Sequence, residues 1–545
     1  MVKKYFSDLK NEFKGYNLSK LIKDLLSGVT VAAVALPLAL AFGVSSGATP
    51  AAGLVTAIIG GIVIGLLSGA SFQISGPTGA MSAILITVVA NYGLNGMFVA
   101  SFFAGIIILL AGIFKLGKLV SFLPSSVVMG FTSGIAIIIA MGQIDNFFGT
   151  VSEGTGAIEK IASYFRIGFS PSWQAVLIGA IVVVFMLLWP KKLNEKVPGS
   201  LLAIVIATVI STLCGFKDLA VVGDIPKSLL LSDSLKLSGI NFEMVSGLIS
   251  PIISVAALGM IESLLCGVSA SRMKNEEFDA NRELVAQGIG NILLPFFGGV
   301  PATAAIARTS VAIKSGEQTR LSGIFHALFL LASMMLLGGV MARLPLSALA
   351  GVLMVTAWRM NEWHGIKHIF KNKIYSAIIQ FLATMIATVI FDLTIAIVIG
   401  IAVAALQFIV SASRVSIETT NVHRTLEKYE SGDDNREVLI SYISGALFFG
   451  NTDTLLKYYK DLNVEGCRHI ILSLRGVPSV DVSGSAALLE ICELLKAKDI
   501  DVRICGVNDR IRKNLDKSGV TAAIGEQGYS ATSSDAVLDV VHKGI

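Results

Sequence analysis

Long apolar segments separated by short polar stretches fill the first three quarters of the chain, and the pattern predicts a multi-pass α-helical membrane protein. Spanning the ~30 Å hydrocarbon core takes about 20 helical residues. Two of the segments, 77–91 and 302–315, are too short to span alone. The apolar segments lie at about 25–43, 50–69, 77–91, 96–114, 123–142, 172–189, 198–214, 246–269, 283–297, 302–315, 322–340, 344–358, 374–391 and 393–412.

The two short segments predict helices that begin inside the membrane. Residues 72–75 and 295–299 precede them, and we expect extended backbone there, which is tolerated only where protein or a cavity surrounds it. Pro301 suits the first turn of the second helix, which would place Arg308 about two turns in. Such helix starts direct free N–H groups and partial positive charge at one point, which favours an anion site.

Matching prolines indicate an internal duplication. Pro301 follows Pro77 by 224 residues, and Pro345 follows Pro124 by 221 residues. Seven segments in each half would make the two halves inverted in the membrane, and broken helices at matching positions mark the binding site of many transporters. The alternative is two unrelated Gly/Pro kinks, because both residues are common in membrane helices.

Composition and charge narrow the class further. The chain of 545 residues is 54% hydrophobic and 15% charged, with a net charge of +5. Its basic residues cluster in alternate loops, which predicts cytoplasmic termini in the plasma membrane, and no basic patch indicates nucleic acid. Residues 1–24 predict either a basic amphipathic helix on the cytoplasmic surface or a solvated tail. The five cysteines show no metal-ligand spacing, so no metal centre or cofactor is expected.

Polarity rises sharply after the last apolar segment. We expect a transmembrane domain over 25–415, a charged linker over 416–436, and a small soluble α/β domain over 437–545, on the cytoplasmic side. Ser483 lies where a strand region leads into a helix. It is interpreted either as the helix N-cap or as a regulatory phosphorylation site.

Two charged residues within apolar segments are the candidates for chemistry, because such residues are costly in a membrane. Arg308 has the planar fork that suits oxyanions, and Thr78 and Thr303 add hydroxyl donors. Glu262 could carry a coupling proton, ligate Na⁺, or form a purely structural ion pair with Arg308. Glu262 precedes Pro301 by 39 residues, as Leu38 precedes Pro77, so their two helices are expected to face the broken ones.

Seven stretches of sequence together resemble the sulfate permease (SulP) family of anion transporters. The last of them resembles a STAS domain. The stretches are VALPLALAFG (34–43), SGPTGAM (75–81), IESLL (261–265), NRELVAQGIGN (281–291), GGVPATAAIART (298–309), FDLT (391–394) and SVDVSGSAALLE (479–490).

The resemblance implies a uracil-permease-type fold with core and gate domains, about 14 spans as a 7+7 inverted repeat, a homodimer, and a STAS domain that could bind a cytoplasmic partner. It implies secondary transport of an anion of the sulfate, bicarbonate or dicarboxylate class by an elevator-like movement. The residues expected at the anion are Pro37, Leu38, Thr78, Gly79, Ala80, Thr303, Ala304, Ala305, Ile306, Ala307 and Arg308.

An acid at the Glu262 position is linked to cation coupling in the family. Some relatives have Asp there, with Thr one turn on, in a Na⁺ site, whereas this chain has Glu262 and Cys266. Because thiols are poor ligands for hard cations, H⁺ symport is favoured over Na⁺.

Three alternatives to cation-coupled uptake stay open. They are an anion exchanger, a nucleobase permease on the same fold, and a STAS-based sensor or scaffold anchored in the membrane. No nucleophile–base pair indicates an enzyme.

Overall fold

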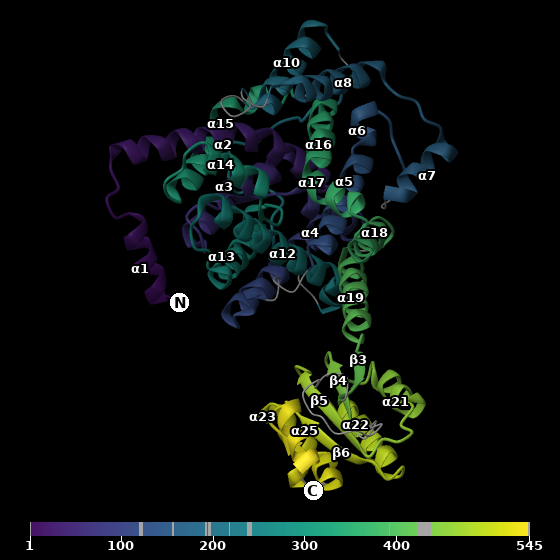
Figure 1. Ribbon diagram of the computed structural model, residues 1–545. Helices are drawn as coiled ribbons and strands as arrows, with labels where there is room; N and C mark the ends of the chain where they lie inside the picture. The colour runs from purple at the N-terminus through teal and green to yellow at the C-terminus, as the bar shows by residue number, and fades with distance from the viewer. Residues whose placement is uncertain are drawn as a thin grey trace. The chain divides into compact units, whose positions relative to one another are not determined.

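The computed structural model describes residues 2–118, 124–154, 157–190, 193, 198–216, 218–236, 242–391, 393–422 and 438–542. Lys191, Lys192, Lys196 and Asp392, and the linker from residue 423 on, lie outside them. The chain forms two compact units, Met1–Ala402 and Val403–Ile545 (Figure 1).

The first unit is helical and matches the predicted apolar segments closely. Seven helices of the described residues are long and apolar enough to cross a membrane, and four apolar helices are shorter. The count of 14 spans stays a prediction. The elements are α1 (Val2–Glu12), α2 (Leu18–Ser45), α3 (Pro50–Leu67), β1 (Ser75–Gly76), α4 (Gly79–Ile113), α5 (Ser125–Gly142), α6 (Ile144–Phe148), α7 (Ala157–Ile167), α8 (Trp173–Leu188), α10 (Gly199–Leu213), α11 (Phe242–Gly247), α12 (Ile249–Lys274), α13 (Ala280–Leu293), η3 (Leu294–Phe297), β2 (Thr303–Ala304), α14 (Ile306–Lys314), α15 (Leu321–Met341), α16 (Leu346–Met360), α17 (Trp363–Lys371), α18 (Tyr375–Ile390) and the first part of α19 (Leu393–Ala412), whose second part belongs to the second unit.

Helix contacts divide this unit into two bundles. In the core bundle, α2, α3, α4, α12, α13, α14 and α15 pack on one another; in the gate bundle, α5, α8, α10, α16 and α18 do so. Figure 1 shows the labels of α13, α3 and α14 to the left of that of α4, and those of α5 and α18 to its right. The helices α4–α5 and α2–α16 make contacts between the bundles.

Glycines set the spacing of the core bundle. A Cβ on Gly105 would lie 2.7 Å from the backbone N of Ile292, and one on Gly288 would lie 2.5 Å from the backbone N of Leu109. Small residues at such crossings let membrane helices approach closely. Gly93, with φ +69°, kinks α4 and separates its short first part from the following span.

The N-terminal segment differs from the single amphipathic helix expected over 1–24. α1 ends at Glu12, and α2 already begins at Leu18, where Asn17 caps it. Acidic residues of α1 then bind buried arginines of the core bundle: Asp8 pairs with Arg282 at 2.6 Å, and Glu12 with Arg320 at 2.7 Å. The position of α1 therefore depends on these two ion pairs and not on its lysines alone.

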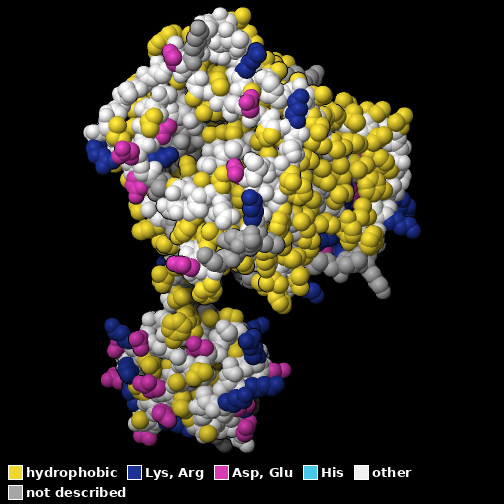
Figure 2. Space-filling model, turned by 180° about the vertical axis from the view of Figure 1, so that it is seen from behind, with side chains coloured by type: hydrophobic (Ala, Val, Ile, Leu, Met, Phe, Trp, Pro, Cys, Tyr) yellow, Lys and Arg dark blue, Asp and Glu magenta, His cyan; other side chains and the backbone are white. Residues whose placement is uncertain are grey.

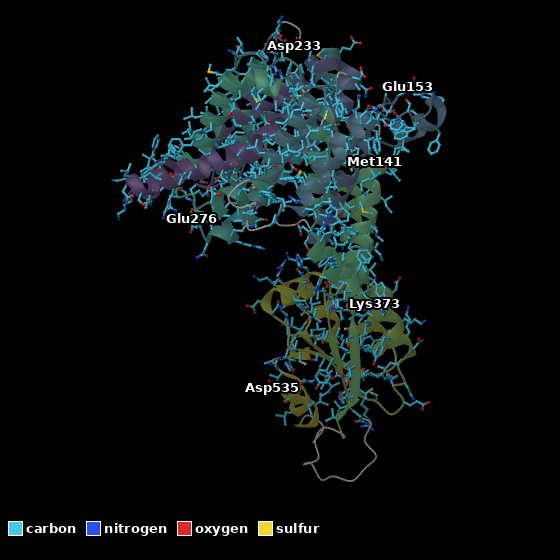
Figure 3. The ribbon with its side chains drawn as sticks, turned by 90° about the horizontal axis from the view of Figure 1, so that it is seen from above. Met141, Glu153, Asp233, Glu276, Lys373 and Asp535 are labelled. Carbon is cyan, nitrogen blue, oxygen red and sulfur yellow. The ribbon has the colours of Figure 1, made fainter. Side chains whose placement is uncertain are left out.

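The surface of the first unit is largely apolar. Figure 2 shows a broad hydrophobic area on one side of the visible face, and charged side chains scattered over the rest of it. Exposed large apolar residues lie on α8, α10, α15 and α18, as expected for helices that face lipid. Glu153, labelled in Figure 3, pairs with Arg166 of the short helix α7.

The second unit contains a five-stranded sheet in the order β3-β4-β5-β6-β7. β3 is antiparallel to β4, and the other neighbours are parallel. The first six residues of the segment expected to be a linker, 416–436, form β3 instead, because they pair with β4. The elements are β3 (Ser416–Asn421), β4 (Val438–Ser444), α21 (Thr452–Asp461), β5 (His469–Gly476), α22 (Val482–Lys496), β6 (Asp501–Cys505), α23 (Asp509–Lys517), α24 (Val520–Ile524), η4 (Glu526–Gly528), β7 (Tyr529–Ser530) and α25 (Ser533–His542).

Candidate functional site

Two broken segments from opposite halves of the chain meet inside the core bundle. β1 pairs antiparallel with β2, with Ser75 opposite Ala304 and Gly76 opposite Thr303. The long helix α4 and the short helix α14 begin within a few residues of these strands. The convergence of two helix starts that the proline spacing predicted is therefore present.

The beginning of α14 differs from the prediction. The helix starts at Ile306, with Ala305 in the N-cap position, so Pro301 lies well before it and Arg308 lies in the first turn. Residues 294–297 form the 3₁₀ helix η3 instead of extended backbone. The prediction failed because Pro301 is followed by residues that pair with β1, and strand pairing delays the helix.

The beginning of α4 agrees with the prediction. Thr78 is the N-cap, and its Oγ1 accepts from the backbone N of Met81 at 3.4 Å. Gly79 and Ala80 follow in the first turn and are buried. The free N–H groups of this turn point back towards the crossing of the two segments.

Glu262 of α12 joins the two broken segments. Its Oε2 accepts hydrogen bonds from Thr78 Oγ1 at 2.8 Å and from Thr303 Oγ1 at 2.6 Å. The two hydroxyl oxygens are 3.2 Å apart. One carboxylate oxygen therefore contacts one residue from each half of the chain.

Arg308 reaches from α14 across to the other broken segment. Its side chain is 1% exposed, and Nη2 donates to the carbonyl oxygen of Pro77 at 2.8 Å. Nη1 has no hydrogen-bond partner among the described residues. Nη1 lies against Gly76, where any Cβ would collide with it. A buried cation with an unused donor is expensive unless an acceptor or an anion joins it.

The structural ion pair between Glu262 and Arg308 is not formed. Within the described chain, the salt bridges do not join these two residues, and each side chain has hydrogen bonds of its own instead. The sequence could not reveal this, because the hydroxyls of Thr78 and Thr303 compete for Glu262. The carbonyl oxygen of Pro77 competes for Arg308. Cys266 is fully buried, and its Sγ donates to Thr309 Oγ1 at 3.5 Å.

The remaining predicted residues surround the crossing unequally. Pro37 and Leu38 are buried in α2, which packs against both α4 and α14. Ala304 is buried in β2. Ile306 is 47% exposed, and Ala307 is exposed as well.

Several polar residues that hold the crossing were not singled out from the sequence. Ser263 Oγ accepts from the backbone N of Ala304 at 3.2 Å, and Thr309 Oγ1 accepts from the backbone N of Ile74 at 3.0 Å. Gln287 of α13 binds Ser75 of β1, and Asn291 of α13 binds Ala302, directly before β2. The polar spacing of α13 at every fourth residue was the signal that could have found them.

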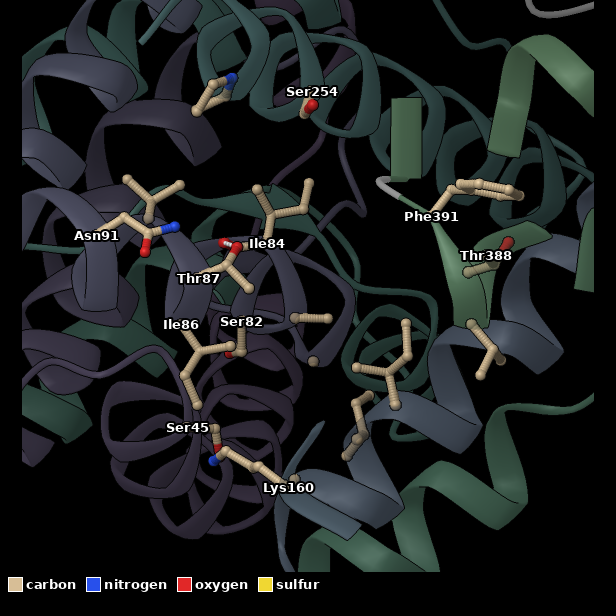
Figure 4. A pocket seen from close by; sticks show the side chains of 18 of the residues that line it. Ser45, Ser82, Ile84, Ile86, Thr87, Asn91, Lys160, Ser254, Thr388 and Phe391 are labelled. Atoms are coloured by element: carbon tan, nitrogen blue, oxygen red, sulfur yellow. Dashed lines mark hydrogen bonds between the residues drawn. The ribbon is translucent and has the colours of Figure 1, made fainter. Parts of the chain in front are cut away.

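A cavity of about 470 Å³ reaches the first turn of α4. It is lined by Gly79 and Ser82 of α4, by Ser45 of α2, and by the end of α18. In Figure 4, Ser82, Thr87 and Asn91 follow one wall, and Thr388 and Phe391 lie across from them. The cavity separates helices of the core bundle from α5 and α18 of the gate bundle, so polar groups beside the α4 N-terminus are accessible from it.

In the second unit, Ser483 is not the cap of its helix. Asp481 is the N-cap of α22 and accepts from the backbone N of Gly484 at 2.7 Å, and Ser483 is the second helical residue. An aspartate two residues earlier competes for the same role, since both are good caps. Phosphorylation of Ser483 stays a prediction. No group of three metal-ligating side chains occurs among the described residues of either unit.

Comparison with known proteins identifies the family. The model of the Sulfate permease family matches residues 21–384, and that of the STAS domain matches residues 432–536. The relative YvdB of Bacillus subtilis (strain 168) is 35% identical over 95% of this chain and 97% of its own. The bicarbonate transporter BicA of a Picosynechococcus species is 30% identical over 91% of this chain and 90% of its own.

A solved structure shows the same fold. The murine Solute Carrier 26 family member A9 anion transporter in the inward-facing state covers 97% of this chain and 93% of its own, with a TM-score of 0.83 and 17% identity. At that identity the likeness concerns the fold alone. The chain belongs to the sulfate permease family, whose members are membrane transporters and not enzymes, and it carries a STAS domain at its C-terminal end.

Proposed function

We propose that this protein is a secondary transporter of a small anion of the sulfate, bicarbonate or dicarboxylate class. The observation that carries the proposal is Arg308, a buried guanidinium in the first turn of α14 whose Nη1 has no acceptor among the described residues. An oxyanion at the crossing would receive this donor together with the N–H groups of α4 and α14. The name of the family and that of BicA support the substrate class.

We further propose that Glu262 couples the anion to H⁺. Moving a charge across the membrane costs about 2.3 kcal/mol per 100 mV, so accumulation of an anion in a negative-inside cell needs a cation to accompany it. Glu262 is a carboxylate that contacts both broken segments, through Thr78 and Thr303. The hydroxyls of Thr78 and Thr303 both donate to it, and Cys266 supplies sulfur where a Na⁺ site would use oxygen. A proton needs no further ligands.

The test is uptake by purified protein in proteoliposomes. Labelled sulfate, bicarbonate and fumarate are offered separately under an imposed pH gradient, an imposed Na⁺ gradient, or neither. We expect the pH gradient alone to drive accumulation of at least one anion. Glu262→Gln, which keeps the shape of the side chain, should abolish that accumulation. Undiminished proton-driven uptake by this variant would remove Glu262 from coupling, and uptake that requires an anion on the opposite side would indicate exchange.

An elevator-like movement of the core bundle past the gate bundle is the proposed mechanism. Gln143, at the end of α5, donates to Ser45 of α2 at 3.0 Å, so this contact joins the two bundles. Cross-linking Ser45→Cys to Gln143→Cys with a bifunctional thiosulfonate reagent should stop transport, and reduction of its disulfides should restore it. The wild-type protein, which has its own five cysteines, controls for other effects of the reagent. Full transport by the cross-linked protein would exclude movement at this contact.

A further inference from the structure

The strand pair at the centre of the core bundle is too small to hold itself. β1 and β2 contribute two residues each, and a two-stranded pair is marginal even when it is longer. Inside a membrane the backbone groups on either side of the pair must also find partners within the protein. The side chains that supply these partners therefore decide where the two helix starts point.

Asn291 of α13 acts towards β2 like a neighbouring strand. Its Oδ1 accepts from the backbone N of Ala302 at 2.8 Å, and its Nδ2 donates to the backbone O of Ala302 at 2.9 Å. Paired residues of antiparallel strands exchange the same two kinds of bond. Asn291 is fully buried, and Ala302 directly precedes Thr303, the hydroxyl donor to Glu262.

Gln287 and Glu283 extend the same face of α13 by one turn each. Gln287 Nε2 donates to Ser75 Oγ of β1 at 2.8 Å and to Glu283 Oε1 at 2.9 Å. Glu283 Oε2 accepts from Ser68 Oγ at 2.6 Å and from the backbone N of Gly69 at 3.0 Å. One helix face thus binds the chain after α3, the strand β1 and the approach to β2.

The need of buried polar groups for hydrogen-bond partners does not by itself explain why three polar side chains lie on this face of α13. α13 packs tightly on α4 through glycines, and an apolar face would pack equally well without the cost of burying a carboxylate and two amides. The three side chains instead reach the irregular backbone on both sides of the crossing. Residues at positions i, i+4 and i+8 of a straight helix form a rigid row, so they hold three segments in one register.

We propose that Glu283, Gln287 and Asn291 are positioning residues of the anion site, and that Asn291 sets the direction of the Thr303 hydroxyl and the α14 N-terminus. They act through the backbone of β1 and β2 without touching the anion. The proposal rests on the proposed function for its transport measurements, and it has a structural readout that does not depend on transport.

The transport experiment compares Asn291→Leu and Asn291→Asp with Ser101→Ala. Leu removes both bonds to Ala302, whereas a protonated Asp can still donate one and accept one. Ser101 Oγ donates to the backbone O of Asn291 at 3.2 Å, so its removal perturbs the same residue without breaking the pairing. We expect Asn291→Leu to raise the KM for the anion at least tenfold. Asn291→Asp should recover towards wild type as pH falls, and Ser101→Ala should stay near wild type.

The structural readout is the reactivity of Cys266, which is buried against Thr309 of α14. Thiol labelling mapped by mass spectrometry should find Cys266 protected in the wild type and in Ser101→Ala but reactive in Asn291→Leu. A wild-type KM together with a protected Cys266 in Asn291→Leu would overturn the proposal. If Asn291→Leu does not fold, Asn291→Asp tests the proposal. The proposal is overturned if neither the labelling of Cys266 nor the KM for the anion changes with pH in Asn291→Asp. If the wild type moves no anion, the proposed function fails, and labelling alone decides the positioning role.

Discussion

The two broken segments share an arrangement of backbone but differ in their chemistry. In the first, Thr78 caps α4 with its side chain, and the neighbouring residues are Gly76, Pro77 and Gly79. In the second, Ala305 offers no side-chain cap to α14, and Arg308 occupies the first turn instead. Glu262, at the repeat position of Leu38, also belongs to the second half.

This difference shows that the backbone geometry of the crossing and its charged side chains have separate origins. Duplication of a half is enough to bring two helix N-termini together, because the backbone alone creates partial positive charge there. It does not supply a fixed cation or a titratable acid. The first half therefore contributes a tightly packed, capped surface, and the second contributes the groups through which an anion and a coupling ion would be bound.

The largest effect is expected from removing the cation of the second segment. Arg308→Gln should weaken anion binding by about 100-fold or more, since a buried charged partner is worth about 3–5 kcal/mol. Arg308→Lys keeps the charge but loses the planar fork and should fall between Gln and wild type. The measurement is the KM for the anion that the wild type carries. An unchanged KM in both variants would assign binding to the helix N-termini alone.

A smaller loss is expected from crowding Arg308 through the first segment. In Gly76→Ala the added Cβ would meet Nη1 of Arg308, so the guanidinium must move. We expect the KM to rise about tenfold, in line with 1.4 kcal/mol per factor of ten. Gly93→Ala in α4 is the matched control, because Gly93 also has a positive φ, at +69°, and no atom lies within 4 Å of its added Cβ. Equal behaviour of the two alanine variants would show that Gly76 does not shape the site.

Substitutions of Thr78 and Thr303 should distinguish the contribution of a hydroxyl to proton coupling from its contribution to capping α4. Thr78→Val and Thr303→Val each remove one hydroxyl that donates to Glu262, so both should reduce proton-driven uptake several-fold. Thr78→Val also removes the cap of α4, at about 1 kcal/mol. Thermal unfolding should therefore show a lower Tm for Thr78→Val than for Thr303→Val. A lower Tm for Thr303→Val than for Thr78→Val would contradict the capping role of Thr78.

The smallest effect concerns the loop that follows α14. Burial raises the pKa of Glu317 well above its usual range, although Lys274 lies 3.6 Å away. The folded protein thus holds a proton that the unfolded chain releases, so stability should fall as pH rises from the usual carboxyl range through the raised pKa. Glu317→Gln should flatten this decline by a few degrees of Tm between pH 5 and 8, in keeping with about 1 kcal/mol.

Glu276→Gln is the control for that measurement. Glu276 lies 3.2 Å from the same Lys274, but its side chain is 44% exposed, and Figure 3 shows it at the edge of the first unit. Because the charge of Glu276 is one of the causes that raise the pKa of Glu317, Glu276→Gln should flatten the pH dependence of Tm by less than Glu317→Gln does. A pH profile of Glu317→Gln that matches wild type would mean that Glu317 is ionised in the fold.

Much of the membrane unit could be predicted because the signal is local. The segment expected at 50–69 is α3 at Pro50–Leu67, and the one at 374–391 is α18 at Tyr375–Ile390. A run of apolar residues must be helical in lipid, whatever its neighbours are. The convergence of the two broken segments followed from the repeat, and Thr78, Thr303 and Glu262 do meet there.

The partners of the buried polar groups could not be predicted in the same way. Arg308 and Glu262 are the two charges that pairing by attraction would join, yet each binds groups of other segments. Asp481 replaces Ser483 as the cap of α22, and pairing with β1 moves the start of α14 beyond Pro301. Each outcome depended on which of several suitable partners lay within hydrogen-bond distance.

The amino-acid sequence by itself determined the membrane class and the positions of the apolar helices, and it indicated a duplication and the costly charges within apolar segments. The tertiary structure alone decided that Glu262 binds two threonines, that Arg308 keeps one donor unused, and that α13 holds both broken segments. The physical reason is that hydrophobicity is a property of each residue and adds up along the chain. A hydrogen bond depends on distance and direction between residues far apart in sequence, and only the folded chain sets these.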